Sequence, residues 1–266
     1  VASLLCPPHL RQPIAAIYAV ARTADDIADE GDAPPAQRLS ELAAYRAELA
    51  RVAAGQTPAA PWAAVFGPLQ AVLNKHALPV PLLDDLLSAF IQDVQKTRDA
   101  QGYADRTELL DYCRRSANPV GRLLLHLYGV TGAQALEESD AICTALQLIN
   151  FWQDLSVDIP RGRHYLPHAD CARHGANPAQ LHTLQSTPET TRLITDCARW
   201  ARDSMEHGAP LVHRLPGRAG WELRLVVQGG LRILDKVDAL QGGSLHTRPR
   251  LHAWDWGVML ARALVM

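Results

Sequence analysis

Apolar residues recur at intervals of three and four along almost the whole chain, which is the period of an amphipathic helix. No useful run alternates apolar and polar positions, so strands are not expected. Stretches rich in proline and glycine at 55–62 and 160–177 predict loops. Helices are predicted over residues 10–29, 38–54, 63–76, 80–98, 106–129, 133–158, 178–185, 188–214, 218–240 and 250–264. The pattern indicates an all-α protein, with residues 1–266 in a single domain.

Two prolines modify this helical pattern. Pro160 is expected to end the helix over 133–158, because the residue before a proline avoids the helical region of backbone space. The pair Asn118-Pro119 falls inside the helix over 106–129, where it should kink or break the helix and free backbone carbonyls.

The length and charge of the chain exclude some classes of function. Its 266 residues are 48% hydrophobic and 20% charged, with a net charge of -2, and this length suffices for one large domain with a sizeable core or at most two small ones. The charges are mixed and form no basic stripe, so a nucleic-acid partner is not expected.

The cysteines and the apolar runs indicate the cellular compartment of the protein and its relation to membranes. The five cysteines are scattered and form no CxxC pair, which is typical of a reduced, cytoplasmic protein. No apolar run approaches the roughly 20 residues that span a bilayer. Peripheral contact with the inner face of a membrane remains open. Trp254 and Trp256 are candidates for that contact, although packing in the core is the favoured interpretation.

An acidic stripe lies in the first predicted helix, where ARTADDIADEGD (21–32) follows the apolar PIAAIYAV (13–20). Tyr18, Arg22, Asp25 and Asp29 are offset by 4, 7 and 11 positions, so they share one narrow helical face. The helix is expected to be buried and to turn these carboxylates into a cavity.

A second stripe repeats the spacing in QLINFWQDLSVDIPRGRHYLP (147–167). Gln147, Asn150, Asp154 and Asp158 share one face of a helix that is apolar nearly all round. Two aspartates one turn apart on a buried helix repel each other and lose solvation, unless a cation neutralises them.

Either acidic pair alone is most often a solvated face, but two matching stripes suit opposed walls of one cavity. Carboxylate oxygens are the ligands of Mg²⁺, whose shell is completed by water and substrate phosphate. Arginines would hold the remaining phosphate oxygens, and the candidates are Arg22, Arg161 and Arg163. The predicted metal ligands are Asp25, Asp26, Asp29, Asn150, Asp154 and Asp158.

Other chemistries have weaker support. No ExxH pair suggests a di-iron bundle, no glycine-rich nucleotide loop occurs, and no nucleophile-elbow motif supports a Ser/His/Asp triad. A group of His164, His168, Cys171 and His174 resembles zinc ligands. Its spacing matches no standard zinc site, so a hydrophilic loop is the favoured interpretation.

At these motifs the chain resembles the squalene and phytoene synthase family, all-α enzymes that act on prenyl diphosphates around a central cavity. The first motif of that family, Tyr-x-x-x-Arg-x-x-Asp-Asp-x-x-Asp, is matched from Tyr18 to Asp29. The second is matched from Gln147 to Asp158 and continues into Gly-Arg-x-Tyr-Leu-Pro at 162–167. Between them, Tyr112 and Cys113 match a Tyr-Cys segment that closes at Gly121.

Two differences from the family's condensing members narrow the subgroup that this chain resembles. Condensing members of the family carry an arginine where this chain has Gln153, and Val-Ala-Gly where it has Ser116-Ala117-Asn118-Pro119. Together with WELRLVVQGGLRILDKV (221–237), these variants resemble the hydroxysqualene synthases of bacterial hopanoid biosynthesis.

The resemblance implies conversion of presqualene diphosphate and water into hydroxysqualene and diphosphate, with Mg²⁺ and without NADPH. A presqualene diphosphate synthase would supply the substrate, and a reductase would act downstream. The alternatives are a head-to-head condensing enzyme of squalene or phytoene synthase type, and a non-catalytic assembly factor.

The same resemblance implies roles for individual residues. Aromatic faces at Tyr112, Phe151 or Trp152 would stabilise a carbocation, with ordinary core packing as the alternative for the last two. Carbonyls freed near Asn118 would hold the attacking water. The implied catalytic residues are Asp25, Asp29, Asp154, Asp158 and Tyr112, and the implied substrate-binding residues are Tyr18, Arg22, Gln147, Asn150, Asn118, Arg161 and Arg163.

Overall fold

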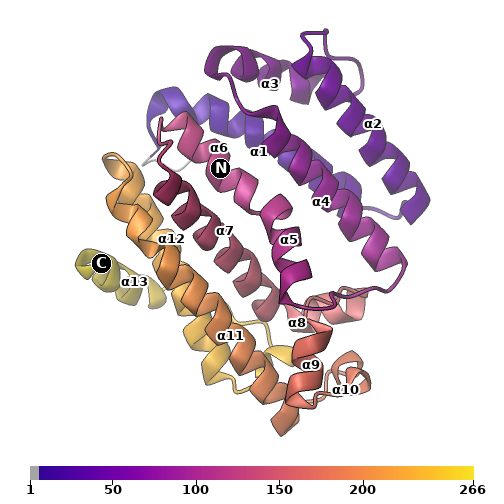
Figure 1. Cartoon of the computed structure of the whole chain (residues 1–266), viewed down its shortest axis with the longest axis vertical. Helices are drawn as coiled ribbons and strands as arrows, with labels where there is room; N and C mark the ends of the chain where they lie inside the picture. The colour runs from indigo at the N-terminus through magenta and orange to yellow at the C-terminus, as the bar shows by residue number, and fades with distance from the viewer. Residues whose placement is uncertain (1–5) are drawn as a thin grey trace. The chain divides into compact units, whose positions relative to one another are not determined.

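The computed structural model describes residues 6–266, and these residues form helices, turns and loops without a strand (Figure 1). The all-α prediction is confirmed. In chain order the helices are α1 (Pro8–Asp29), α2 (Pro35–Ala53), α3 (Ala63–His76), α4 (Val80–Arg98), α5 (Arg106–Ser116), α6 (Asn118–Leu127), α7 (Ala133–Gln153), α8 (Leu155–Asp158), η1 (Ile159–Arg161), α9 (His168–His174), α10 (Pro178–His182), α11 (Pro188–Gly208), η2 (Ala209–His213), α12 (Arg218–Ala239), η3 (Gly243–Leu245) and α13 (Asp255–Val265).

The contacts divide the chain into two compact units. Unit 1 comprises Val1–Asp99 and Arg115–Gly132, and it contains α1 to α4 and α6. Unit 2 comprises Ala100–Arg114 and Ala133–Met266, and it contains most of α5 and all helices from α7 onward. Each unit is described by itself.

Unit 1 is built on contacts of α1 with α2, α3 and α4, and α6 packs against α4 and α1. Tyr45 on α2 is fully buried at the centre of its core. Its ring lies 4.7 Å from the ring of Phe66 and 5.2 Å from that of Trp62. Its hydroxyl donates to the carbonyl of Val20 at 3.1 Å, which satisfies a polar group that would otherwise be costly to bury. This bond fixes α1 against α2.

Unit 2 is built on α7 and α11, which pack along each other and are both contacted by α12. Close packing at Gly208 on α11 makes this possible. A Cβ at that position would lie 2.5 Å from the carbonyl oxygen of Glu138 and 2.9 Å from the backbone nitrogen of Ile142. Only glycine allows the backbones to approach so closely. Helix α13 then packs on α12.

The predicted helix over 106–129 is broken rather than kinked. Helix α5 ends at Ser116, Ala117 takes φ -120° and ψ -49°, and α6 begins at Asn118 with Pro119 in its first turn. Proline suits a first turn because its missing N–H has no helical partner there. The prediction that Asn118-Pro119 kinks or breaks the helix is therefore confirmed, in the form of a break.

The predicted helix over 133–158 is also divided, at Asp154. This residue has φ -102° and ψ 13° and stands between α7 and the short α8. The α-helix ends at Asp158, as predicted, but the predicted cause was wrong. Ile159, the residue before Pro160, keeps helical dihedral angles of φ -58° and ψ -46°. The chain instead continues through η1 to Gly162, whose positive φ of 76° turns it away from the helix axis.

The predicted loop over 160–177 contains η1 and α9. An ion-pair network in unit 2 holds α9: the Arg106 guanidinium lies 2.7 Å from Asp170 on α9 and 2.7 Å from Asp196 on α11. The same guanidinium stacks 4.6 Å from the ring centre of Trp200. Asp170 is buried, so its carboxylate loses solvation. The ion pair with Arg106 offsets that cost and thereby stabilises the position of α9.

Other helices follow the predictions more closely. Helices α3 and α4 have the predicted bounds, whereas the segment 188–214 ends in the 3-10 helix η2 and the final helix begins at Asp255 rather than at 250. Between residues 6 and 266, no helix combines the length and apolar character needed to cross a bilayer.

Candidate functional site

In unit 1, helix α1 carries the first acidic motif along one side. Its opposite side supplies Ile17, Val20 and Ala24 to the core of the unit. Tyr18 and the carboxylates occupy the other side, where the side chains of Asp25 and Asp26 are 44% and 46% exposed. The motif is therefore on one face of α1 as predicted, but that face is half-exposed rather than buried.

Arg22 neutralises this face by pairing with three carboxylates. Its guanidinium lies 2.9 Å from Asp25, 2.7 Å from Asp26 and 2.8 Å from Glu30. The negative charges, Asp26 first, raise the pKa of Arg22 above its usual range. Asp29 is exposed at the last position of α1. The arginine predicted to hold phosphate thus pairs with the motif's own carboxylates.

In unit 2, Arg248 performs the same function for the second motif. It forms a bidentate pair with Asp154, in which Nη2 lies 2.9 Å from Oδ2 and Nε contacts Oδ1. The Asp154 side chain is 13% exposed, so much of this pair is shielded from water. Bidentate arginine–carboxylate pairs are the strong class of ion pair.

Asp158 lies one turn further along, and it is 8% exposed. Burial, followed by the negative charge of Asp154, raises the pKa of Asp158 to about 7, while the positive charges of Arg161 and Arg248 lower it. Arg163 lies 3.9 Å from the same carboxylate. A cation bound beside Asp158 would be favourable in place of the proton, because it would offset both the desolvation of the carboxylate and its repulsion by Asp154.

The remaining polar residues of the second motif lie on α7. Gln147 is half-buried and Asn150 is exposed. The backbone ladder continues from Asn150 through Asp154 to Asp158, with N–H to carbonyl distances of 2.9 and 2.8 Å, so their predicted spacing survives the break. Gln153 donates to the carbonyl of Pro249 at 2.6 Å.

An aromatic cluster in unit 2 surrounds Tyr112. The rings of Phe151 and Tyr165 are stacked with centres 3.8 Å apart. The ring of Tyr112 lies 6.2 Å from Phe151 and 6.3 Å from Tyr165, and the ring of Tyr103 lies 5.6 Å from Tyr112. Trp152 is fully buried and packs edge-on against Phe151. The cluster offers several π faces close to the second motif in sequence.

The break between α5 and α6 lies in unit 1 and holds the predicted Asn118 site. The Asn118 side chain is 7% exposed, and Pro119 beside it is buried. Within the described part of the chain, the buried hydroxyl oxygen of Ser116 has no hydrogen-bond partner. A hydroxyl in that condition is a natural site for one water molecule.

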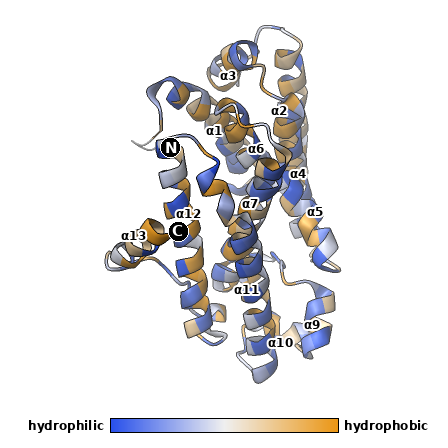
Figure 2. Cartoon of the chain, turned by 60° about the vertical axis from the view of Figure 1, so that its left-hand side comes forward, coloured by the Kyte–Doolittle hydropathy of each residue, from blue (hydrophilic) through white to orange (hydrophobic). Residues whose placement is uncertain are grey.

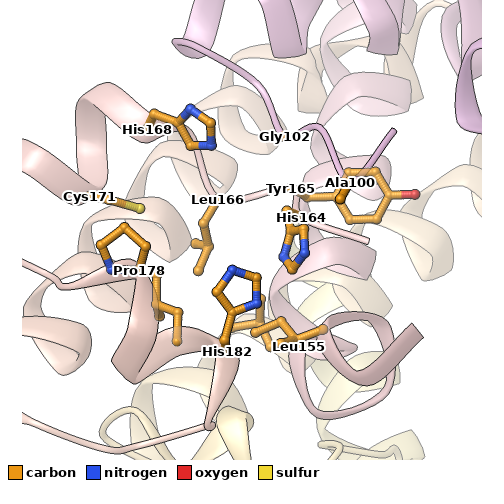
Figure 3. A pocket seen from close by; sticks show the side chains of 12 residues that line it. Ala100, Gly102, Leu155, His164, Tyr165, Leu166, His168, Cys171, Pro178 and His182 are labelled. Carbon is orange, nitrogen blue, oxygen red and sulfur yellow. The ribbon is translucent and has the colours of Figure 1, made fainter. Parts of the chain in front are cut away.

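A pocket of about 100 Å³ in unit 2 is lined by residues of α8, α9 and α10 and of the segments between them (Figure 3). His164, His168, His182 and Cys171 line it with Leu155 and several other apolar side chains. The rings of His164 and His182 are in edge-to-face contact, with centres 4.6 Å apart. Burial is the main cause that lowers the pKa of His164, and the charges of His182 and His168 lower it further.

The zinc alternative fails on the geometry of this region. His174 turns to Asp196, 3.2 Å away, and does not line the pocket with the other three. Burial raises the pKa of Cys171 to about 11, so the thiolate that zinc requires is disfavoured. Over residues 6–266, no group of three or more His, Cys, Asp or Glu side chains is arranged to hold a metal ion.

The predicted residues thus form two groups. Unit 1 contains Tyr18, Arg22, Asp25, Asp26, Asp29 and Asn118, and unit 2 contains Tyr112, Gln147, Asn150, Asp154, Asp158, Arg161 and Arg163. That the two stripes are opposed walls of one cavity remains a prediction.

Arg248 and Tyr165 were not identified from the sequence. Arg248 lies 94 residues from Asp154 in a loop with no motif, so no local signal marks it. Tyr165 was visible as part of the Gly-Arg-x-Tyr-Leu-Pro segment, but its stacking on Phe151 depends on the turn at Gly162.

Comparison with known proteins agrees with the motifs. Residues 1–255 match the family described as squalene/phytoene synthase. The chain is 33% identical to a hydroxysqualene synthase of Sinorhizobium fredii over 253 residues, which cover 95% of this chain and 82% of the relative. It is 30% identical to a phytoene synthase of Thermus thermophilus over 265 residues, which cover 99% of this chain and 86% of the relative.

Solved structures give the same result. The crystal structure of a squalene synthase from Alicyclobacillus acidocaldarius superposes with a TM-score of 0.81 at 34% identity, covering 90% of this chain and 87% of that one. A dehydrosqualene synthase at 20% identity shares the fold, with a TM-score of 0.80 over 98% of this chain and 88% of that one. The chain therefore belongs to the squalene/phytoene synthase family.

Proposed function

We propose that this chain converts presqualene diphosphate and water into hydroxysqualene and diphosphate, with Mg²⁺ bound by its two aspartate motifs. The observation that carries the proposal is Gln153, which stands where condensing members are expected to have an arginine. Its amide donates to the carbonyl of Pro249 at 2.6 Å, so position 153 makes a neutral structural hydrogen bond, and the cation beside Asp154 comes from Arg248 instead. Relatives named hydroxysqualene synthase at 33% and 38% identity support the same reaction.

The donor atoms of the two motifs suit Mg²⁺ in chemical type, although over residues 6–266 no three of these carboxylates are gathered into a preformed metal site. All of the side-chain donors are carboxylate or amide oxygens, the hard ligands that this ion prefers. In each unit a guanidinium now supplies the positive charge that these oxygens require. The residues that would hold the metal are Asp25, Asp26 and Asp29 of unit 1 and Asn150, Asp154 and Asp158 of unit 2. When bound, Mg²⁺ supplies Lewis-acid assistance to the departure of diphosphate.

The arginines then act on the substrate. Arg22 and Arg248 would donate to the diphosphate oxygens if the carboxylates were neutralised otherwise, with Arg161 and Arg163 as further donors. Substrate binding would then be linked to the release of the Arg22–Asp25 and Arg248–Asp154 ion pairs.

The reaction balances without a reductant. The carbon–oxygen bond to diphosphate breaks, and the leaving group keeps the electron pair, so a cyclopropylcarbinyl cation remains. The cation rearranges, one water adds to it, and a proton is lost. No hydride is consumed, and therefore no NADPH is required.

The chain's apolar and aromatic residues control that water. The faces of Tyr112, Phe151 and Tyr165 stabilise positive charge and exclude bulk solvent. The unpaired Ser116 hydroxyl supports the prediction that a single water is held near Asn118.

The test is a product analysis with two substrates. Purified protein is incubated with Mg²⁺ and no reductant, first with farnesyl diphosphate and then with presqualene diphosphate. Hydroxysqualene formed only from presqualene diphosphate is the expected result. Asp154→Asn should abolish that activity while the circular dichroism spectrum is retained, and Asp99→Asn, which alters an exposed carboxylate outside both motifs, is the matched control.

The second candidate is a head-to-head condensing enzyme. It is favoured by the match to the Thermus thermophilus phytoene synthase, which covers 99% of this chain. Conversion of farnesyl diphosphate into presqualene diphosphate or a C30 hydrocarbon would establish it. A protein that processes no prenyl diphosphate with or without Mg²⁺ would instead support a non-catalytic assembly factor.

The substrate and product place this reaction between two others. An enzyme that joins two farnesyl diphosphates must supply the substrate, and a relative of that kind is a presqualene diphosphate synthase of Rhodopseudomonas palustris. A reductase that removes the new hydroxyl would consume the product.

A further inference from the structure

Arg248 reaches Asp154 from a short segment of unit 2 that has little structure of its own. Residues 248–251 lie between η3 and α13, and within residues 6–266 no backbone-to-backbone hydrogen bond involves them. A segment of this kind keeps one conformation only where groups from elsewhere hold it. The position of the Arg248 guanidinium therefore depends on what anchors the two ends of this segment.

The end of the segment next to Arg248 is held by neutral hydrogen bonds. Just before it, the N–H of Thr247 donates to the carbonyl of Gly243 at 2.9 Å. Just after it, the carbonyl of Pro249 accepts from the amide of Gln153. A single neutral hydrogen bond contributes only modestly to stability, because water competes for the same groups. These two bonds leave the far end of the segment without an anchor.

Asp255, the first residue of α13, anchors that far end. Its buried carboxylate accepts from the N–H of His252 at 2.7 Å, and its own N–H donates to the carbonyl of His252 at 2.9 Å. The same carboxylate pairs with Arg232 at 2.7 Å and with Lys236 at 2.9 Å, and both cations lie on α12. Charge-assisted hydrogen bonds are about twice as strong as neutral ones. One carboxylate thus ties the chain at His252 to α12.

The anchor is shielded from water. The side chains of Arg232 and Lys236 are 16% and 17% exposed, and an ion pair is stronger where little water screens it. Trp254 covers both cations, with its ring centre 4.7 Å from Arg232 and 4.6 Å from Lys236, where α13 lies beside α12 (Figure 2). Trp254 and Trp256 are themselves exposed, so the expectation that they pack in the core was wrong.

Asp255 is charged but is not available to a ligand. Burial alone would raise the pKa of Asp255, but the N–H of His252 and the charges of Lys236 and Arg232 lower it below its usual range. Its oxygens already accept from these three groups. Any effect of Asp255 on the second motif therefore passes through the segment that it holds.

We propose that Asp255 is a positioning residue of the second motif, which ties residues 248–252 to α12 and thereby keeps the Arg248 guanidinium at Asp154. The inference rests on the proposed function, because Arg248 is one of the arginines assigned to the diphosphate. An arginine that is fixed in advance loses less conformational freedom when it binds an anion. The same fixed arginine competes with a metal ion for Asp154. Asp255 should therefore favour diphosphate and disfavour metal alone.

The test measures these two ligands by titration calorimetry with the whole protein. Without diphosphate, Asp255→Ala should bind Mn²⁺ about threefold more tightly than the wild type, because a mobile Arg248 occupies Asp154 less fully. With excess Mg²⁺, the same variant should bind inorganic diphosphate about tenfold more weakly, because Arg248 must be ordered on binding. A substitution that merely loosened the fold would weaken both ligands, so the opposite signs identify positioning.

Two further variants assign the effects to Arg248. In the Arg248→Gln background, Asp255→Ala should change neither affinity, since residues that act through one another are not additive. The matched control is Arg262→Gln, which breaks the 2.9 Å pair between α13 and Asp235 of α12 but leaves the Asp255 anchor intact. This control should bind both ligands as the wild type does.

Asp255→Asn keeps an acceptor for the N–H of His252, and it should shift both affinities in the same directions as Asp255→Ala but by less. It carries the test if circular dichroism shows that Asp255→Ala does not fold. The proposal is overturned by unchanged affinities, by changes of the same sign, by equal changes in the Arg248→Gln background, or by an Arg248→Gln protein that binds both ligands normally. Neither titration needs turnover, so a protein that forms no hydroxysqualene would refute the proposed function and leave these results standing.

Discussion

Replacement of Arg248 by glutamine should make the ligand-free protein bind divalent metal more tightly. In the structure, the Arg248 guanidinium occupies both oxygens of Asp154, so a metal ion must displace it before it can bind there. Glutamine keeps most of the side-chain length but removes the charge. The variant therefore presents Asp154 without its internal counter-ion.

The size of the effect follows from the exposure of the pair. The Arg248 side chain is 40% exposed and that of Asp154 is 13% exposed, so the pair lies between a surface and a buried ion pair. A bidentate pair in this setting contributes about 1–2 kcal/mol, which corresponds to a five- to thirtyfold gain in metal affinity when it is removed. Loss of the arginine also removes a charge that lowers the pKa of Asp158. That pKa should rise above about 7, so metal binding at neutral pH should release more protons.

Titration calorimetry with Mn²⁺ or Mg²⁺, in two buffers of different ionisation enthalpy, measures both the affinity and the proton release. Arg250→Gln, two positions along the same loop, is the control and should bind metal as the wild type does. If Arg248→Gln binds metal no more tightly than the wild type, the arginine does not compete for Asp154, and the reasoning fails.

Three further predictions concern stability, each measured by urea unfolding. Because the raised pKa of Asp158 means that the folded state binds the extra proton, metal-free protein should lose stability as pH rises from about 4 to about 7. Asp158→Asn should remove on the order of 2 kcal/mol of the difference between pH 5 and pH 8, and an unchanged pH profile would contradict this. Arg106→Ala should cost about 1–3 kcal/mol, because the buried Asp170 then keeps only the more exposed Arg173 as its ion-pair partner, and an unchanged free energy of unfolding would contradict the account of α9. Gly208→Ala should cost at least about 2 kcal/mol, since its methyl would meet the Glu138 carbonyl, whereas an unchanged unfolding midpoint would show that α7 and α11 can separate freely.

The helices of this chain could be predicted because each buries one periodic face. The bounds of α3 and α4 follow from that period together with Pro79, which immediately precedes α4. Helix boundaries were predicted wrongly where the backbone of a residue leaves the helical conformation while its side chain keeps the helical spacing. Asp154 interrupts α7 without changing the spacing of the second motif, so the motif was visible and the interruption was not.

The candidate site was predictable as far as its residues lie within one helix. The offsets in Tyr18 to Asp29 specify a shared face from local geometry alone. They do not reveal how that face is neutralised, because the partner can come from anywhere in the chain. Arg22 was close enough to be named, whereas Arg248 reaches the second motif from a distant loop. The exposure of Trp254 and Trp256, which are 60% and 52% exposed, was missed for a related reason, since the sequence pattern at a helix start does not show whether an apolar residue faces a core or solvent.

The division of the chain into two interleaved units has a consequence for its synthesis. Unit 1 is interrupted by residues 100–114, and its last helix, α6, supplies Leu123, which is fully buried in that unit's core. A nascent chain that has reached only residue 99 therefore lacks part of the surface that should cover α1 and α4. Unit 1 can close only after α6 has left the ribosome, by which time the first segment of unit 2 is already outside. Such partly covered intermediates expose apolar surface, and they are the stage at which a chaperone would be most useful to this protein.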